Sequence, residues 1–274
     1  IVSDKGFGLN DYIETTRPLV VVTAPGPGSG KMATCLSQLY HEHKRGVMAG
    51  YGKYETFPIW NLPLKHPVNL AYEAATADLQ DVNMIDPYHL EAYGEMTVNY
   101  NRDVEAFPIV RTILSRITGD DNFYRSPTDM GVNMAGYAIV DDEACRQASY
   151  QEIIRRYYKG LCDLKMGREK QETVDKLEML MQQTRLKKED RAVVGYAMAK
   201  SAACGNVPAA AVELPDGRII TGKATRLMSA VSGAVLNSIK VMAGIPKNVL
   251  LMSPQILEPV LRLKIDLLQS HSSV

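Results

Sequence analysis

The stretch VVVTAPGPGSGKMAT, residues 20–34, combines the patterns of a buried strand, a glycine-rich loop and the start of a helix. Residues 18–24 are apolar and rich in β-branched side chains, which predicts a strand buried on both faces. From Gly30 to about Lys44, apolar residues recur at helical spacing and predict a helix. A strand, a glycine loop and a helix in this order open a βαβ unit, so the stretch predicts an α/β fold.

The loop matches part of the phosphate-binding pattern Gly-x-x-x-x-Gly-Lys-Ser/Thr. Gly30 and Lys31 occupy the positions of the second glycine and the lysine, whereas Pro25 replaces the first glycine. Met32 replaces the hydroxyl residue that holds magnesium in that pattern, and Ser29 is the better substitute for it. These departures argue against ordinary ATP hydrolysis. The dinucleotide pattern Gly-x-Gly-x-x-Gly fits worse, because it requires a glycine where Lys31 stands.

An anion is the ligand that such a loop favours, because glycines allow close approach of the backbone and a helix N-terminus carries partial positive charge. We therefore predict that a nucleotide or another phosphorylated molecule binds at Gly26, Gly28, Ser29, Gly30 and Lys31. Whether magnesium accompanies the phosphate is left open by the sequence. The alternative is a tight turn between strand and helix, with the lysine side chain in solvent.

Acidic residues at the ends of predicted strands are the candidates for catalysis beside a bound phosphate. Asp86 follows a short strand predicted at 81–86, His89 lies three residues further on, and Asp141 follows apolar residues 136–140. Each is a candidate acid, base or metal ligand. The alternatives are structural, because Asp141 can cap the helix that follows it and Asp86 precedes a proline, as turn-forming residues often do.

Two further polar segments lie in the first half of the chain. Arg102 stands at the head of a predicted helix and can clamp a carboxylate or phosphate, although a surface ion pair is the simpler interpretation. Ser126, Thr128 and Asp129 surround a proline in the pattern of a helix N-terminus. We expect capping there, with the loop that follows converging on the same cleft as the glycine loop.

The predicted architecture has two parts. Residues 1–165 are expected to form an α/β domain with a parallel or mixed sheet flanked by helices, including another strand at 47–57. Residues 166–274 are expected to be mainly helical, with one β-hairpin at about 209–222. The hairpin prediction rests on Asp216 and Gly217, which can supply the positive backbone angles of a tight turn.

Composition limits the classes of function. Lys plus Arg and Asp plus Glu number 31 each, so no net charge attracts the chain to nucleic acid or to an anionic membrane. The four cysteines lie far apart and form no Cys-x-x-Cys pair, which favours reduced thiols and argues against a zinc site. With no apolar run of about 20 residues, we expect a soluble cytoplasmic protein. The sequence begins at Ile1, so an upstream segment can carry a signal that is not seen here.

Several long blocks carry a family resemblance over almost the whole chain. They include ETFPIWNLPLKHPVNLAYEAATADL at 55–79, SPTDMGVNMAGYAIVDDEA at 126–144 and LPDGRIITGK at 214–223. Through these blocks the chain closely resembles the bacterial domain-of-unknown-function family eighteen forty-six, also known as uncharacterised protein family three seventy-one. The resemblance implies a bacterial cytoplasmic protein with α/β layers and supplies no catalytic residue. It also implies an incomplete chain, with more α/β sequence before Ile1 and more sequence at the C-terminal end, where LQSHSSV departs from the family pattern.

Two functions from different classes follow from these patterns. The first is an enzyme that acts on a phosphorylated small molecule or a nucleotide held by the glycine loop. The second is a noncatalytic binding or self-associating protein, in which the loop is architectural and helices rich in small residues form a subunit contact. We expect a homo-oligomer under either function.

Overall fold

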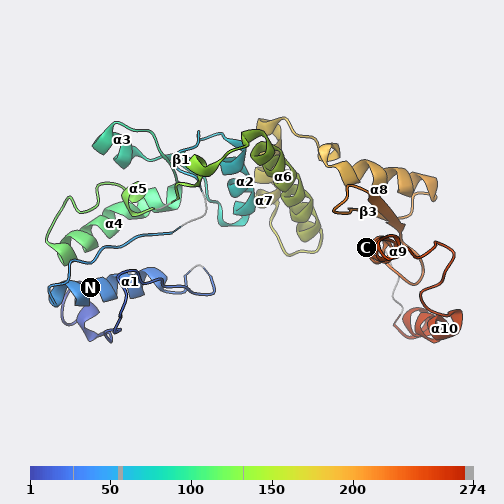
Figure 1. The fold of residues 1–274 in the computed structure, drawn as a ribbon, viewed down its shortest axis with the longest axis horizontal. Coiled ribbons are helices and arrows are strands. Elements are labelled where there is room, and N and C mark those ends of the chain that lie inside the picture. Colours follow the sequence, from blue (N-terminus) through green and yellow to red (C-terminus); the bar gives the residue numbers. More distant parts are fainter. Residues whose placement is uncertain (27, 55–57, 132, 269–274) are drawn as a thin grey trace. The chain divides into compact units, whose positions relative to one another are not determined.

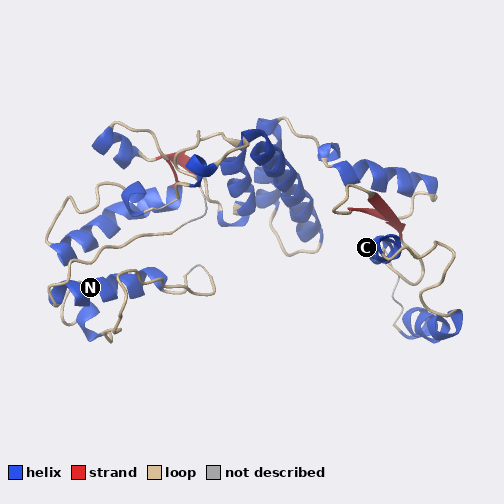
Figure 2. Ribbon diagram, viewed as in Figure 1, coloured by secondary structure: helices blue, strands red, loops and turns tan. Residues whose placement is uncertain are grey.

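The structure is a computed structural model that describes residues 1–26, 28–54, 58–131 and 133–268. The chain divides into two compact units, residues 1–184 and residues 185–274. Figure 1 labels the helices α1 to α10 and the strands β1 and β3, and Figure 2 shows that helices dominate both units and that the strands are short. None of the helices in these described ranges combines the length and apolarity needed to cross a lipid bilayer.

Unit 1 is built mainly from helices. Its elements are α1 (Lys31–Lys44), α2 (Pro67–Ala75), β1 (Asn83–Ile85), α3 (Pro87–Tyr93), β2 (Val98–Tyr100), α4 (Asn101–Thr118), α5 (Pro127–Met130), α6 (Asp142–Lys165) and α7 (Gln171–Thr184).

The parallel or mixed sheet predicted for the first half of the chain is wrong. Among the described residues of unit 1, the only sheet is the antiparallel pair β1 and β2, in register from Asn83 opposite Tyr100 to Ile85 opposite Val98. A parallel pair needs a crossover of a dozen or more residues, usually with a long helix. The connection here, residues 86–97, contains one short helix, α3, and β2 returns antiparallel to β1. The one parallel contact described is an isolated bridge between Lys53 and Gly131.

Three predicted strands are not strands in the described structure. Residues 18–24 have no strand partner among the described residues, and residues 47–54 have only the isolated bridge at Lys53. Residues 136–140 overlap a turn of 3₁₀ helix at Ala135–Ala138. Residues 55–57 of the strand predicted at 47–57 lie outside the described residues. A strand is stable only when a neighbour satisfies its backbone groups, and local pattern does not reveal whether that neighbour exists. The strand predicted at 81–86 is confirmed as β1.

The helix after the glycine loop is confirmed. It begins at Lys31, and Gly30 precedes it with a left-handed φ of 88°. Leu36, Leu39 and Tyr40 are buried as predicted and face a core with Phe107 of α4. Of the other residues predicted on the inner side, Cys35 is half-buried and Met32 is exposed to 36%.

Unit 1 has two regions of buried apolar side chains. The first joins α1, α4 and α5 and consists of Phe7, Leu36, Leu39, Tyr40, Phe107, Val110, Leu114 and Met130. The second lies where α6 packs against α2 and α7. A side chain at Gly160 would approach Leu177 to 2.8 Å, so glycine lets α6 and α7 come close together. These contacts fix α4 and α5 next to the start of α1, where the candidate site lies.

Unit 2 contains the predicted hairpin. Its elements are α8 (Ala192–Ala203), β3 (Ala209–Glu213), β4 (Ile219–Lys223), α9 (Ala230–Met242) and α10 (Pro254–Arg262). The hairpin and the mainly helical character of residues 166–274 are confirmed. Gly217 alone supplies a positive φ, 82°, and the prediction of the same angle at Asp216 is wrong, because the turn closes from Leu214 to Arg218 over three residues.

The small residues of α9 pack inside unit 2. Gly233, Ala234 and Ser238 are buried, and Gly222 of β4 touches the backbone of α9 at Ala234. A β-carbon at Gly222 would lie 2.1 Å from the Ala234 nitrogen, so only glycine allows this approach. Small residues therefore serve the hairpin–helix contact within the unit.

The boundary placed by sequence at 165/166 falls in the turn between α6 and α7. Both helices belong to the first compact unit and pack against each other. The residue that follows α7, Arg185, has a left-handed φ of 58° and is the first residue of unit 2.

The surface of α6 gives a prediction for acid stability. Hydrogen bonds from Arg155 lower the pKa of the Glu152 carboxyl, burial partly opposes them, and a hydrogen bond from Arg156 lowers the pKa further. The net effect takes the pKa from 4.5 to about 2. A lowered pKa in the folded state adds stability above pH 4.5 that is lost as the pH falls toward 2. We expect wild-type protein to lose about 1 kcal/mol more than Glu152→Gln between pH 6 and pH 2.5, after discounting for solvent screening.

Urea unfolding followed by circular dichroism at the two pH values measures this difference. Glu105→Gln, at an exposed position of α4, is the matched control and should track wild type. Equal acid losses in wild type and Glu152→Gln would contradict the prediction.

Candidate functional site

The glycine loop forms the N-terminal approach to α1 and is open on its surface. Gly28 and Gly30 have φ values of 70° and 88°, a left-handed conformation that glycine adopts without steric cost. A β-carbon built at Gly26, Gly28 or Gly30 would meet no described heavy atom within 4 Å. The loop therefore has space on its outer side for a ligand.

Lys31 is folded back over this loop. Its Nζ donates to the Gly26 carbonyl oxygen at 2.8 Å and to Ser29 Oγ at 3.3 Å. Ser29 Oγ in turn donates to the Gly26 carbonyl. An ammonium group has three N–H donors, so these contacts leave one for a ligand. The lysine charge is thus held at the loop.

The first backbone amides of α1 add donors on the same segment. The first hydrogen bond of the helix runs from Thr34 N to the Gly30 carbonyl at 3.0 Å. Helix geometry leaves the earlier amides, from Lys31 to Ala33, for other acceptors, and glycine at the N-cap has no side chain to accept them. The Lys31 ammonium carries a full positive charge and these amides carry partial positive charges, all at the start of α1.

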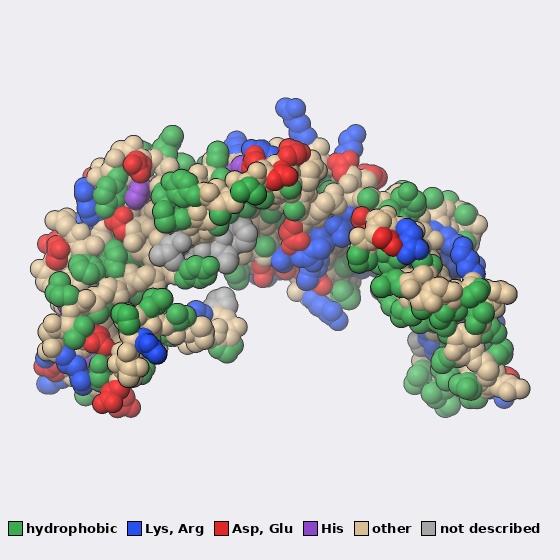
Figure 3. Space-filling view, in the orientation of Figure 1, with side chains coloured by type: hydrophobic (Ala, Val, Ile, Leu, Met, Phe, Trp, Pro, Cys, Tyr) green, Lys and Arg blue, Asp and Glu red, His purple; other side chains and the backbone are tan. Residues whose placement is uncertain are grey.

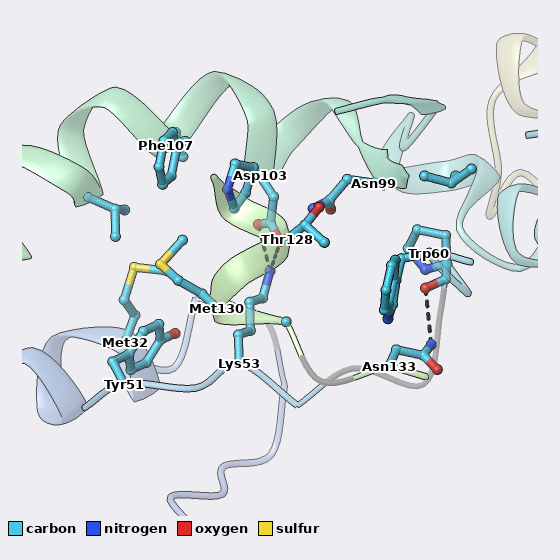
Figure 4. Close-up of a pocket in the computed structure, with 16 residues that line it drawn as sticks. Met32, Tyr51, Lys53, Trp60, Asn99, Asp103, Phe107, Thr128, Met130 and Asn133 are labelled. Carbon is cyan, nitrogen blue, oxygen red and sulfur yellow. Dashed lines mark hydrogen bonds and ion pairs between the residues drawn. The ribbon is translucent and has the colours of Figure 1, made fainter. Parts of the chain in front are cut away.

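A pocket borders the first turn of α1. Its lining residues come from α1, α4, β2, α5 and the neighbouring loops: Met32, Tyr51, Lys53, Pro58, Trp60, Val98, Asn99, Asp103, Ala106, Phe107, Val110, Pro127, Thr128, Met130, Gly131 and Asn133. Figure 4 shows Met32, Tyr51 and Met130 at one end and Trp60 and Asn133 at the other. The cavity holds about 50 Å³, which is room for a few water molecules and less than a nucleotide needs.

An ion pair crosses the middle of this pocket. Lys53 Nζ contacts the Asp103 carboxylate and the Tyr100 hydroxyl, and Figure 4 shows the lysine reaching from its loop to α4. Both partners of the pair are mostly buried. Buried charges are costly to separate, so the pair holds the loop at residue 53 against α4.

Asp86 lies at the centre of a buried hydrogen-bond network next to the pocket. Its side chain accepts from the Tyr88 and His89 amides at 3.0 and 3.1 Å, which makes it the N-cap of α3. It also accepts from Thr128, from the hydroxyl at 2.6 Å and the amide at 3.2 Å. The side chain is 0% exposed, and these four donors occupy both oxygens. Asp86 thus joins α3 to α5.

His89 is brought together with Ser126. Its Nδ1 lies 2.9 Å from Ser126 Oγ and 3.7 Å from an Asp129 carboxylate oxygen. A serine beside a histidine and a carboxylate is the arrangement of a nucleophile and its base. Here, however, Ser126 is 0% exposed and its oxygen accepts the Asp129 amide as the cap of α5. The geometry makes this group a clamp between α3 and α5, with the serine closed to a substrate.

A tyrosine closes the exposed side of this clamp. Tyr93 donates its hydroxyl to Asp129 at 3.0 Å, and its ring lies 4.6 Å from that of His89. Desolvation, followed by the hydrogen bond to Asp129, raises the pKa of the Tyr93 hydroxyl. The hydroxyl therefore stays a hydrogen-bond donor at neutral pH.

The remaining residues singled out by sequence lie elsewhere. Asp141 is exposed, caps α6 through the Ala144 amide at 2.9 Å, and has no contact with Asp86 or His89. Arg102 pairs with buried Asp81 at 2.7 Å. Ser126 and Asp129 form the capping box expected at α5. Among the described residues, no three His, Cys, Asp or Glu side chains come together as ligands for a metal ion.

Sequence reasoning missed Lys53 and Trp60 as pocket residues. Lys53 stands in YGKY, residues 51–54, without a motif around it, and only the fold pairs it with Asp103. The lone tryptophan in a proline-rich loop was the available signal in the sequence. In the structure, the Trp60 ring has a tilted contact with His89 and an edge-on contact with Tyr137. Trp60 lines the pocket, and its ring centroid lies 6.4 Å from that of His89 in the clamp.

Comparison with known proteins places this architecture in one family. The description "Domain of unknown function DUF1846, N-terminal" matches residues 1–185, and the corresponding C-terminal domain matches residues 189–274. These matches cover nearly the whole chain. The chain belongs to the DUF1846 family.

Similar bacterial proteins carry the name UPF0371. One from Fusobacterium nucleatum is 58% identical over 275 residues, covering 96% of this chain and 54% of its own length. One from Clostridioides difficile is 55% identical over 279 residues, covering 99% and 56%. One from Streptococcus thermophilus is 57% identical over 272 residues, covering 99% and 55%. The chain thus spans about half the length of the curated relatives it matches.

Proposed function

We propose that the described residues of the glycine loop, 25–26 and 28–32, bind the phosphate group of a small molecule. The observation that carries the proposal is the position of the Lys31 ammonium, held over an open glycine loop by Gly26 and Ser29. A phosphate there accepts from the ammonium and from the first amides of α1, which is how helix N-termini bind anions. The rest of the ligand lies toward Met32 and the pocket it lines.

The pocket argues for a compact partner or for opening on binding. At about 50 Å³ it does not hold a nucleoside next to the loop. A small phosphometabolite such as a phosphosugar requires less opening of the pocket than a nucleotide does, and is the ligand class that we propose. The clamp around Asp86 and His89 then supports the pocket wall through Thr128, and neither residue contacts the ligand.

Thermal unfolding with inorganic phosphate, a phosphosugar panel and nucleotides tests this proposal. A ligand at about one hundred times its Kd should stabilise the protein by about 2.7 kcal/mol. Lys31→Ala should remove most of that stabilisation, because the charge and its donor are lost, and Lys31→Arg should keep part of it. Lys65→Ala changes an exposed lysine of the same unit and should bind as wild type does.

Equal stabilisation of wild type and Lys31→Ala would contradict the role of the loop. Silence across the whole panel would favour the second candidate, a self-associating protein. An exposed apolar stripe on α9 supports that candidate: Val231, Val235, Ile239 and Met242. Figure 3 shows hydrophobic side chains gathered around α9 and α10. For a self-associating protein we expect a melting temperature that rises with protein concentration and does not change when phosphate is added.

A further inference from the structure

Residues 19–22 form an apolar segment that the described structure leaves uncovered. Leu19, Val20 and Val21 are exposed to 79%, 51% and 75%, and Val22 is half-buried. No hydrogen bond joins the backbone of residues 19–24 to another residue in the described part of the chain. Three adjacent exposed large apolar residues are unusual for a folded surface, where such residues occur singly.

The pattern of this segment indicates how it is buried. Successive side chains of a strand point to opposite faces, so Leu19 and Val21 share one face while Val20 and Val22 share the other. Both faces are apolar, which is typical of a strand inside a sheet that is covered on both sides. Three β-branched valines in a row favour the extended conformation such a strand needs.

The size of the relatives indicates what covers the segment. The chain spans 54% to 56% of the relatives from Fusobacterium and Clostridioides, so nearly half of each relative lies outside the match. A second copy of this chain can offer the same segment edge to edge, but that pairing leaves both faces open. A segment that is apolar on both faces requires strands beside it and layers above and below it.

We propose that residues 18–24 are a docking strand for the remaining part of the full-length UPF0371 protein, which contributes a neighbouring strand and the covering layers. This inference does not depend on phosphate binding. It bears on the glycine loop all the same, because the strand ends at Ala24 and the loop begins at Pro25. Docking fixes the loop at the end of a strand in a sheet, where ligands of open α/β sheets bind.

Hydrogen–deuterium exchange on a full-length chimera tests the proposal. The chimera carries residues 1–274 of this chain, with the rest of the length taken from the Fusobacterium nucleatum relative. Amides of residues 19–23 should exchange at least about 100-fold more slowly in the chimera than in residues 1–274 alone. Exchange at the same fast rate in both proteins overturns the proposal. Protection in residues 1–274 alone that grows with concentration also overturns it, in favour of a second copy.

A pair of substitutions in the chimera tests the side chains. Val21→Lys places a charge on one face of the strand and should reduce the protection of residues 19–23 by about 10-fold or more. Val140→Lys, at another exposed valine of the same unit, should leave that protection unchanged. Val21→Ile keeps the apolar branched shape and should behave as wild type does. Undiminished protection in Val21→Lys overturns the assignment.

Discussion

Asp86→Ala is expected to lower the free energy of unfolding of unit 1 by about 3–5 kcal/mol. The substitution leaves two backbone amides of α3 and both donors of Thr128 without their acceptor in a buried site. Each buried donor left unpaired costs about 1–3 kcal/mol, and partial rearrangement limits the sum. Urea unfolding at neutral pH, followed by circular dichroism, measures the loss.

Asp141→Ala is the matched control for this prediction. Asp141 also caps a helix, but it is exposed, and among the described residues its side chain accepts only the Ala144 amide, so we expect a loss of about 1 kcal/mol. The sequence suggested Asp86 and Asp141 alike as candidate acids, bases or metal ligands, and this comparison measures how much more Asp86 contributes to stability. Equal losses for both substitutions would show that the network around Asp86 does not stabilise the fold.

Gly222→Ala should destabilise unit 2 by about 3 kcal/mol or more. The added β-carbon would lie 2.1 Å from the Ala234 nitrogen and 2.5 Å from the Gly233 carbonyl carbon. These are backbone atoms of α9 and cannot rotate away, so the hairpin and the helix have to separate. Overpacking against flexible side chains costs about 1–3 kcal/mol, and a backbone contact is less forgiving.

Gly195→Ala in α8 is the control with the opposite sign. No described atom lies within 4 Å of a β-carbon at Gly195, and alanine favours a helix over glycine by about 0.5–1 kcal/mol. We expect a higher melting temperature for this variant and a lower one for Gly222→Ala. A tolerated Gly222→Ala would contradict the close contact between β4 and α9.

Local patterns predicted the elements whose stability is local. The helix at residues 31–44 has apolar side chains at helical spacing. The hairpin turn requires a positive φ at Gly217, a backbone angle that few residue types other than glycine adopt. The strand predicted at residues 18–24 has an equally strong pattern, but a strand depends on a partner elsewhere in a chain. The described residues provide no such partner, and the pattern could not show that.

The candidate site divides in the same way. The glycine loop was visible because backbone conformation and charge depend on adjacent residues, from Gly26 to Lys31. Asp86 and His89 are three residues apart, but their side chains bond to Thr128 and Ser126, about 40 positions further along the chain, which no local pattern predicts. The contact between Lys53 and Asp103 spans a similar distance and has no motif, so only the fold reveals it.

The division of the chain after Thr184 has a consequence for calorimetry. Each unit folds around its own contacts, so heat absorption should show two overlapping transitions whose calorimetric enthalpy exceeds the van't Hoff value of either one. Asp86→Ala then moves one peak and Gly222→Ala the other. With two transitions, a single melting temperature for residues 1–274 describes neither unit, and each variant has to be assigned to its own peak.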